Sequence, residues 1–278
     1  MAVRIITDTA SDVPQDVADR LGIVLVPLSI RFGEDEFVDR EELSGAEFWQ
    51  RCATSSTLPE TSAPAPGRFQ AAFEAAKADG CDSVVVITIS SELSATYQSA
   101  RAAAEAIAPY PVTVIDSRSV TLGEGLLVIE AAEAAASGMD YASVVSLVRE
   151  TIPRVGVLGV LDTLEHLKKG GRIGSAQALL GSMLAIKPLL TVSDGVVAEA
   201  GRARTRAKAL DATAKTALAA GPFHRLGIAH GDAADVDVIL AKLADAPTDV
   251  PVLVGGIGPV VGTHGGPGII GICWITKA

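Results

Sequence analysis

The chain has 278 residues, of which 49% are hydrophobic and only 4% aromatic, and its mean hydropathy is +0.37. This composition excludes intrinsic disorder, and the length favours a large single fold or two domains over a mini-protein. The 33 acidic and 23 basic residues leave a net charge of −10, which disfavours nucleic acid or an anionic membrane surface as a partner.

Cysteine usage and the N-terminus indicate a cytoplasmic protein. The three cysteines, Cys52, Cys81 and Cys273, are too few and too widely spaced for a disulfide framework, and no spacing suggests a zinc site. Asp8 interrupts the N-terminal apolar run before a signal peptide could develop, and no apolar run reaches the roughly 18 residues of a membrane-spanning helix. We therefore expect a cytoplasmic protein without an integral membrane segment.

The first half alternates β-branched runs with helical patterns, which predicts parallel strands joined by crossover helices. Ser11 or Asp12 is expected to cap the first helix, with Pro14 in its first turn, and Ser44 with Glu47 indicates a capping box. The expected strands lie at 3–7, 23–31, 83–89 and 112–115, the expected helices include 68–79, 122–137 and 141–152, and a loop is expected at 52–67.

The second half mixes a hairpin into this alternation. Asp194-Gly195 is a strong two-residue turn signal between two strands. The expected strands lie at 155–161, 186–192, 196–200, 226–229, 252–254 and 269–275, and the expected helices at 176–185, 206–220 and 236–244. The patterns predict an α/β protein of two domains, an N-terminal parallel-sheet α/β domain over residues 1–153 and a C-terminal α+β domain with a mixed or antiparallel sheet over residues 154–278.

Three segments offer polar groups where a ligand could bind, because parallel sheets place ligands beyond the carboxyl ends of their strands. Residues 90–96 are expected to open a helix, with Ser94 and other hydroxyls beside free backbone N–H groups that favour an anion. Thr61 and Ser62 form a second hydroxyl pair, and His264 is the titratable residue of a glycine-rich segment. Ordinary helix capping is the commoner role for any single serine of residues 90–96, and it also explains much of the Thr61-Ser62 pair.

Other chemistries stay open at this point. Ser94, His264 and Asp116 could form the triad of a lipid esterase or thioesterase, although no spacing or local motif favours it. Asp8 and Asp12 follow the first strand and are interpreted as helix caps in preference to metal ligands. A small-ligand α/β enzyme is a further alternative, which a short and polar pocket would favour.

Several short motifs occur in an order and spacing that are specific when taken together. They are Ile6-Thr7-Asp8-Thr9, Pro27-Leu28, Thr61-Ser62-Ala63-Pro64, Leu93-Ser94-Ala95-Thr96, Ile115-Asp116-Ser117, Lys169-Gly170-Gly171-Arg172, Ile186-Lys187-Pro188 and His264-Gly265-Gly266-Pro267-Gly268. On these motifs the chain resembles, over nearly its whole length, the DegV family of bacterial fatty-acid-binding proteins, which serve as acyl carriers for fatty-acid kinase.

The resemblance implies a two-domain protein that encloses a fatty acid, with the acyl chain in an apolar tunnel and the carboxylate near the first-domain loops. It implies that Thr61, Ser62, Ser94 and His264 bind the carboxylate. It also implies that Arg172 contacts the kinase partner. The protein would then be a lipid carrier and not itself an enzyme. It would need no metal or other cofactor, and a separate fatty-acid kinase would form the acyl phosphate.

Three residues depart from the family pattern. Ala63 stands where the family commonly has Gln, Ala95 where it often has Gly, and Gly265 where Thr is usual. A methyl group at Ala95 changes how closely the backbone can approach a carboxylate, whereas the hydroxyls of Thr61 and Ser94 are retained.

Overall fold

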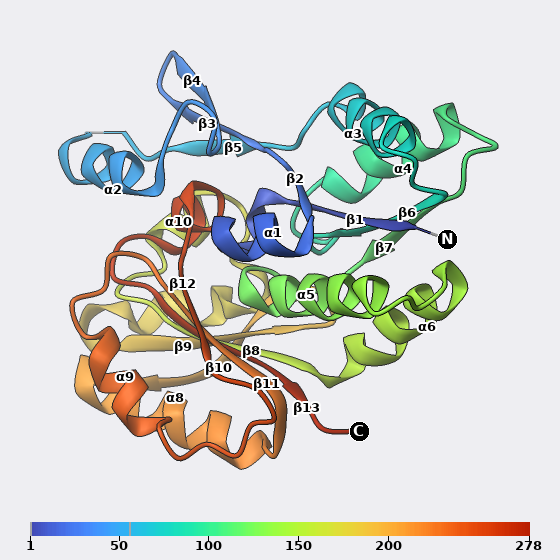
Figure 1. The fold of residues 1–278 in the computed structure, drawn as a ribbon. Coiled ribbons are helices and arrows are strands. Elements are labelled where there is room, and N and C mark those ends of the chain that lie inside the picture. Colours follow the sequence, from blue (N-terminus) through green and yellow to red (C-terminus); the bar gives the residue numbers. More distant parts are fainter. Residues whose placement is uncertain (1, 56) are drawn as a thin grey trace.

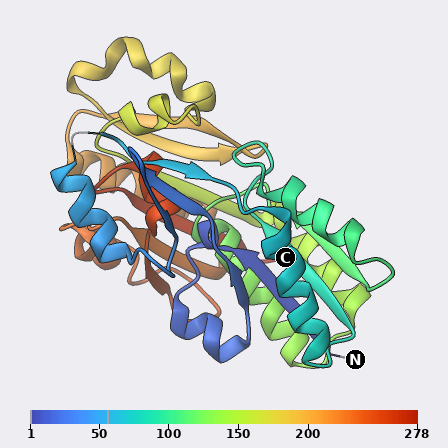
Figure 2. The ribbon, with the colours of Figure 1, turned by 90° about the horizontal axis from the view of Figure 1, so that it is seen from above.

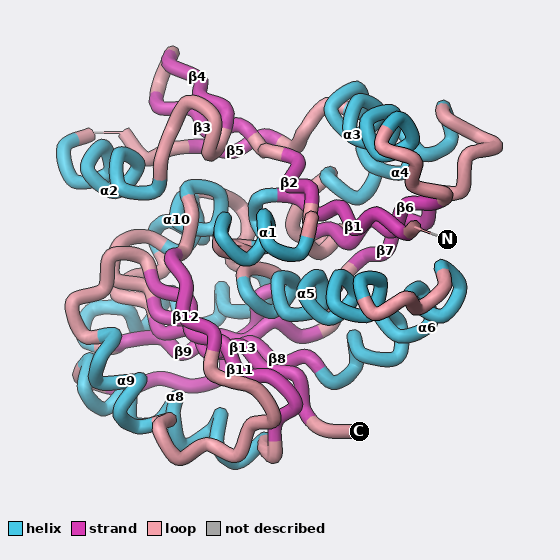
Figure 3. Tube along the Cα trace, in the orientation of Figure 1, coloured by secondary structure: helices cyan, strands magenta, loops and turns pink. Residues whose placement is uncertain are grey.

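The computed structural model describes residues 2–55 and 57–278, and for residues 181–185 it describes the backbone alone. Figure 3 shows that the strands gather into separate sheets with helices between and around them. The first sheet has the strand order β2-β1-β6-β7 and is parallel throughout. It comprises β1 (Val3–Asp8), β2 (Val24–Val26), β6 (Ser83–Thr88) and β7 (Val112–Asp116). The prediction of a parallel sheet in the first half is confirmed.

A three-stranded antiparallel sheet, which the sequence analysis missed, lies next to the parallel one. Its order is β4-β3-β5, with β3 (Ser29–Phe32), β4 (Asp35–Val38) and β5 (Glu60–Ser62). The single strand predicted at 23–31 is wrong because Pro27 has no N–H to continue a ladder, so β2 and β3 enter different sheets. The predicted loop at 52–67 is wrong where Thr61 pairs with Ile30, and Ser56 lies outside the described residues.

The third sheet is mixed and has the order β10-β9-β8-β13-β11-β12, as the second half was expected to provide. Its strands are β8 (Val155–Val160), β9 (Lys187–Ser193), β10 (Val196–Ala203), β11 (Phe223–His230), β12 (Leu253–Gly256) and β13 (Ile270–Thr276). The predicted hairpin is confirmed, because Asp194 and Gly195 join β9 to β10 with φ of 52° and 83°, the positive values that a tight turn between twisted strands needs.

Helices separate and cover the two large sheets in layers (Figure 1). On the parallel sheet, α3 (Pro66–Ala78) and α4 (Thr96–Ala106) cover one face, and α5 (Leu122–Ala136) and α6 (Tyr141–Thr151) cover the other. The far face of the mixed sheet carries α8 (Arg206–Ala220) and α9 (Val236–Lys242). In the described part of the chain, no helix combines the length and apolar character needed to cross a membrane.

Shorter elements fill the connections. They are α1 (Gln15–Leu21), α2 (Gly45–Thr54), α7 (Glu165–Lys169), α10 (Pro259–Gly265) and three 3-10 segments, η1 (Thr9–Ser11), η2 (Ile152–Arg154) and η3 (Gly174–Ala185). The capping box of Ser44 and Glu47 is confirmed at the start of α2. The helix predicted at 176–185 is a 3-10 segment, which Figure 2 shows at the edge of the molecule beside β10.

Helix α5 lies between the parallel and the mixed sheet and packs against both. Its residues are apolar on nearly every side, which is typical of a helix buried all round. A Cβ on Gly123 would lie 2.4 Å from Val157 Cγ2, and one on Gly125 would lie 2.5 Å from the carbonyl oxygen of Ser11. The two glycines therefore allow α5 to approach β8 and η1 closely. Because both sheets share this helix, the domain boundary at residue 153 stays a prediction.

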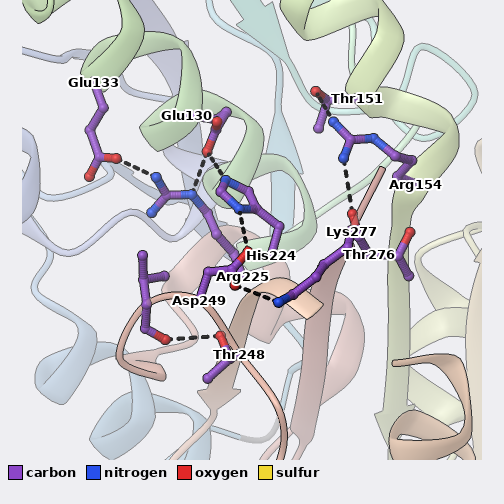
Figure 4. A network of polar contacts seen from close by, with 11 residues as sticks. Glu130, Glu133, Thr151, Arg154, His224, Arg225, Thr248, Asp249, Thr276 and Lys277 are labelled. Atoms are coloured by element: carbon purple, nitrogen blue, oxygen red, sulfur yellow. Dashed lines mark hydrogen bonds and ion pairs between the residues drawn. The ribbon is translucent and has the colours of Figure 1, made fainter. Parts of the chain in front are cut away.

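A polar network fastens the C-terminal part of α5 to β11 (Figure 4). Arg225 is 8% exposed and donates to Glu133 and, at 2.6 Å, to Glu130, which His224 also contacts at 3.0 Å. Burial by itself would raise the pKa of Glu130, but the hydrogen bond and charge of Arg225 lower it below its ordinary value. Because removing one partner of a buried ion pair leaves the other charge desolvated, this contact resists separation of α5 from the mixed sheet.

Glu124 is a buried carboxyl group on α5 that has no cationic partner in the described structure. Its Oε1 accepts a hydrogen bond of 2.9 Å from the hydroxyl of Thr7, whereas its Oε2 has no hydrogen-bond partner among the described residues. Desolvation by burial, followed by the negative charge of Asp8, holds the pKa of Glu124 well above its ordinary value of 4.5. The folded protein therefore retains a proton that the unfolded chain releases.

This proton makes stability depend on pH. The contribution of Glu124 is complete below pH 4.5, where both states are protonated, and it is lost as the pH rises toward the folded-state pKa. The slope is at most about 1.4 kcal/mol per pH unit. We expect the Glu124→Gln variant, which keeps the bond to Thr7, to lose less unfolding free energy between pH 5 and 7 than the wild type in urea titrations. The exposed Glu34→Gln is the control, and equal losses in all three proteins would contradict a buried neutral acid.

Candidate functional site

A cavity of about 190 Å³ lies between loops of the first half and one face of the mixed sheet. Most of its lining is apolar. The first half contributes Leu28, Ile89, Leu93 and Val120, and the mixed sheet with its connections contributes Val157, Leu161, Leu167, Leu190, Val197 and Ile269. All six residues of the latter set belong to the buried cluster that packs under α5, so the cavity is a gap within the hydrophobic core. Such a lining favours a hydrocarbon over a polar metabolite.

Four of the predicted site residues line this same cavity, although they come from distant parts of the sequence. Thr61 lies on β5, Ser94 precedes α4, Arg172 follows α7, and His264 lies in the last turn of α10. Ser62 does not join them. It is exposed and follows Thr61 on a β-strand, where successive side chains point to opposite faces.

The glycine-rich segment that carries His264 forms the helix α10, for which the sequence analysis gave no prediction. Pro259 occupies the first turn of α10, a place where its missing N–H costs no hydrogen bond, and this was the signal that sequence reasoning overlooked. The helix points His264 toward β5, where its Nε2 lies 2.9 Å from the hydroxyl of Thr61. This contact joins residues that are 203 positions apart in the chain.

His264 is neutral near pH 7. Burial, and then the positive charges of Arg172 and His166, lower the pKa of His264 to about 4. Its Nδ1 has no hydrogen-bond partner among the described residues. A Cβ on Gly170 would lie 2.3 Å from that Nδ1, so glycine at this position gives the ring its space. The ring is thus a neutral group that can donate a hydrogen bond to Thr61 through Nε2.

Ser94 is held by the start of α4. Its hydroxyl lies 2.8 Å from the hydroxyl of Thr96 and accepts a bond of 3.3 Å from the Thr96 N–H. A helix does begin within residues 90–96, as predicted, but α4 starts only at Thr96, so the serines of this segment precede it. Two other serines of the segment are used elsewhere, since Ser90 donates to the carbonyl of Gly195 at 2.7 Å and Ser91 donates to Asp116. Of the three serines in this segment, only Ser94 therefore lines the cavity.

Arg172 adds positive charge to the polar part of the cavity. Its Nε donates to the carbonyl of Leu93 at 3.0 Å, and its Nη1 donates to the carbonyl of Gly170 at 2.7 Å. Both bonds end on main-chain oxygens next to site segments, so they fix the guanidinium close to Ser94 and His264. The charge of Arg172 also contributes to the lowered pKa of His264. An anion placed here would meet a fixed cation and uncharged donors.

Asp8 and Asp12 are structural anchors. Asp8 caps η1 by accepting from the N–H of Ala10 at 3.0 Å, and it also accepts from the N–H of Ile89 at 2.9 Å. The prediction that Ser11 or Asp12 caps α1 is wrong, because Pro14 occupies the cap position without a side-chain bond. Burial raises the pKa of both aspartates to about 7. Within the described residues, no cluster of His, Cys, Asp and Glu could hold a metal ion.

Asp12 instead accepts hydrogen bonds from two other segments near the cavity. The hydroxyl of Thr121 donates to it at 2.6 Å, and the N–H of Gly258 donates at 2.8 Å. Thr121 lines the cavity, and its φ of 52° is strained for a β-branched residue. Sequence reasoning missed this residue, because nothing in the local pattern predicts a positive φ at a threonine.

The arrangement gives no support to an esterase triad. The hydroxyl of Ser94 pairs with Thr96, and the ring of His264 pairs with Thr61. Asp116 accepts from Ser91 and, at 2.8 Å, from the N–H of Arg118. Each proposed member of the triad is therefore bonded to another residue. The mainly apolar lining likewise argues against the small polar pocket that a metabolite enzyme would show.

The three departures from the family pattern, Ala63, Ala95 and Gly265, all line the cavity. At Gly265 the packing explains why a residue without a side chain fits. A Cβ there would lie 2.5 Å from Ile269 Cδ1, so a larger residue would push Ile269 away from α10. Gly265 and Ile269 thus form one matched surface beside His264.

The burial of His264 makes its titration a direct test of the site. We expect the ring to stay neutral from pH 8 down to about 5, because its pKa in the folded protein is about 4. Unfolded histidine binds a proton near pH 6.5, so this residue makes the protein less stable as the pH falls from about 6.5 toward 4. Ring nitrogen shifts in NMR measure the charge, with His264→Gln identifying the signal. A midpoint at the ordinary value would contradict the buried geometry.

Comparisons with known proteins agree with this fold. A family model described as "Uncharacterised protein, DegV family" matches residues 2–277. A DegV domain-containing protein of Clostridium perfringens is 36% identical over 285 residues, covering 100% of both chains.

The solved structure of a DegV family protein from Thermus thermophilus, described by its fatty acid binding, has 34% identity and a TM-score of 0.92. DegV of Bacillus subtilis, described as a fatty acid binding protein, has 29% identity and a TM-score of 0.89. Both structures are matched over 100% of each chain. The resemblance seen in the sequence motifs is confirmed, and the chain belongs to the DegV family.

Proposed function

We propose that this protein is a carrier that binds a long-chain fatty acid in the cavity and presents its carboxylate to a separate fatty-acid kinase. The observation that carries the proposal is one mainly apolar cavity whose polar lining residues include Thr61, Ser94, Arg172 and His264, which could hold an acid. Two relatives from Thermus thermophilus and Bacillus subtilis are described as fatty acid binding, which supports the lipid as ligand. In this proposal the chain is not itself a catalyst, and it takes no cofactor.

The hydrogen bond between Thr61 and His264 suits a carboxylate in one tautomer. When His264 Nε2 carries the proton, it donates to the Thr61 oxygen, and the Thr61 hydroxyl hydrogen is free to donate to the ligand. In the other tautomer the lone pairs of Thr61 would face the carboxylate and repel it. A bound fatty acid therefore selects the Nε2–H form. Ser94 supplies a second hydroxyl, and Arg172 stabilises the negative charge from nearby.

This head-group site leaves a carboxylate oxygen available for reaction. The Nε and Nη1 of Arg172 already donate to main-chain carbonyls, so these donors cannot form a bidentate clamp on the ligand. Hydroxyl donors, one of them oriented by the neutral imidazole, hold the acid more loosely than such a clamp would. An oxygen that is not locked in an ion pair can attack the phosphoryl group supplied by the kinase. Arg172 also remains the residue that we propose for contact with that partner.

The acyl chain is expected to provide most of the affinity. Each buried methylene contributes about 0.8 kcal/mol, so a chain of about fourteen contributes on the order of 11 kcal/mol before ordering costs. One or two head-group hydrogen bonds contribute about 1 kcal/mol each. The shape of the cavity should therefore decide which acids bind, while Thr61, Ser94 and His264 decide how the carboxylate is placed.

We further propose that residues 1–153 carry the main carboxylate-binding loops and that residues 154–278 complete the tunnel. Thr61 and Ser94 come from the first segment, and most apolar lining of the mixed sheet comes from the second. Arg172 and His264 also line the cavity, which supports a contribution of the second segment to the head-group site as well. A cytoplasmic location fits the three cysteines, none of which forms a disulfide.

The ligand class can be tested on the purified protein. We expect native mass spectrometry to show a bound species and denaturing extraction to release about one fatty acid of 14 to 18 carbons per chain. This range of lengths is the one that the family resemblance suggests. If no lipid copurifies, palmitate added to the protein should bind and raise the melting temperature. A protein that neither carries nor binds a fatty acid would overturn the proposal.

The division between tail and head group predicts the behaviour of two variants. Ser94→Ala and Thr61→Val should each weaken fatty acid binding only about fivefold, because each removes about 1 kcal/mol. Both should reduce acyl phosphate formation by the partner kinase far more, since the carboxylate loses its position. Ser62→Ala is the matched control and should change neither quantity, because Ser62 is exposed. Equal proportional losses of binding and phosphorylation would count against this division.

A further inference from the structure

Two glycines lie side by side in the cavity wall. Gly159 on β8 and Gly271 on β13 are direct partners in the antiparallel ladder, and both line the cavity. On the other side of Gly159 lies Leu190 of β9, which also lines the cavity. Glycine in the middle of a buried strand weakens the strand, so such a pair calls for a physical reason.

The pleat of the sheet points both positions into the cavity. On β8, Val157 and Leu161 share the face of Gly159 and line the cavity, whereas Leu158 and Val160 pack in the cluster under α8. On β13, Ile269 precedes Gly271 by two residues and lines the cavity, whereas its direct neighbours Ile270 and Ile272 pack under α8. Any side chain at Gly159 or Gly271 would therefore extend into the open space.

Neither the backbone nor the surrounding protein explains the two glycines. Both lie outside the residues with positive φ, so an ordinary residue could adopt their conformation. A Cβ on Gly159 would have Leu161 Cδ1 as its nearest neighbour at 3.5 Å, and one on Gly271 would have the Ala229 oxygen at 3.8 Å. Both distances are ordinary contacts.

Gly156 on the same strand shows the contrast. A Cβ at Gly156 would lie 2.1 Å from a ring atom of Trp274, so that glycine makes room for a protein side chain. The space above Gly159 and Gly271 is instead left unfilled by the protein and belongs to the cavity. Two neighbouring glycines with free space above them would allow a ligand to lie directly on the backbone.

The pair also lies on the route from the polar site to the far part of the cavity. Ile269, one row before Gly271, contacts the α10 surface at Gly265 next to His264. Beyond the glycine row the lining continues to Val157 and to Val197, which pairs with Val192 on β9. A chain that extends along β8 and β13 from the Ile269 end, next to His264, toward Val157 would pass over Gly159 and Gly271.

We infer that Gly159 and Gly271 form the floor over which the acyl chain passes, and that they set how long a chain the cavity accepts. The inference rests on the proposed function and adds the specificity-determining positions to it. A side chain at either position narrows the passage and excludes the methylenes that would lie beyond it. At about 0.8 kcal/mol per methylene, each excluded group lowers the affinity about fourfold.

The test is a series of saturated fatty acids from 8 to 18 carbons titrated into the wild type, Gly159→Val and Gly271→Val. Wild-type affinity should rise with chain length until the cavity is full. In each variant the rise should stop several carbons earlier, so that affinity for palmitate falls at least tenfold while affinity for octanoate stays within about threefold. Gly159→Ala and Gly271→Ala should give smaller shifts in the same direction, and they provide folded variants if valine prevents folding.

Gly256→Val is the matched control. Gly256 lies on β12 of the same sheet, has no positive φ, and a Cβ there would meet nothing within 4 Å, yet the residue does not line the cavity. This variant should keep the wild-type length profile. If the wild type binds no fatty acid, the proposed function fails. If it binds but the glycine variants keep its length profile, or lose affinity equally at every length, the inference on Gly159 and Gly271 alone is overturned.

Discussion

The carboxyl group of Asp12 joins the segments on which the site depends. It follows η1 in a left-handed conformation and accepts hydrogen bonds from Thr121, at the start of α5, and from Gly258, just before α10. Because α5 separates the two large sheets and α10 carries His264, one buried side chain fixes the cavity wall and the head-group residue together. Burial raises the pKa of Asp12 to about 7, and the two donors act against that rise, so they stabilise its charged form.

The polar and apolar parts of the site are built by different means. The apolar part is a gap in the ordinary packing between α5 and the mixed sheet, and it needs small residues more than special ones. The polar part needs single side chains at defined places, and the fold supplies each of them from a different element or connection. Gly170 illustrates how the two parts meet, because its lack of a side chain admits the ring of His264. Under the proposed function, the choice of acyl chain and the placement of the carboxylate can therefore vary independently.

Much of the architecture could be predicted from local patterns. The parallel strands, the hairpin at Asp194-Gly195 and the capping box at Ser44 depend on residues close in sequence, and all three are present. The small sheet was missed because β5 is only three residues long and becomes a strand through pairing with β3. The role of Asp12 was misjudged because its partners, Thr121 and Gly258, are distant in the chain.

The same distinction applies to the site. The motifs identified the family, and they pointed to Thr61, Ser94, Arg172 and His264, which the structure places around one cavity. They could not separate Thr61 from Ser62, because only the pairing of β5 decides which of two neighbours faces inward. Nor could they give meaning to Gly159 and Gly271. A glycine in a strand acquires its role only when its partner across the ladder and the space above it are known.

The location of the cavity within the core has a consequence for the stability and degradation of the protein. Leu161, Val157 and Ile269 belong to the buried cluster that holds α5 in place, and each also borders the gap. Under the proposed function, a bound hydrocarbon completes this cluster as though it were a side chain added after synthesis. Unfolding of the loaded protein must expose the lipid as well as the chain, so occupancy adds to the stability of the whole molecule. The cellular lifetime of this protein would then follow the supply of its own cargo, with the empty form the first to be degraded.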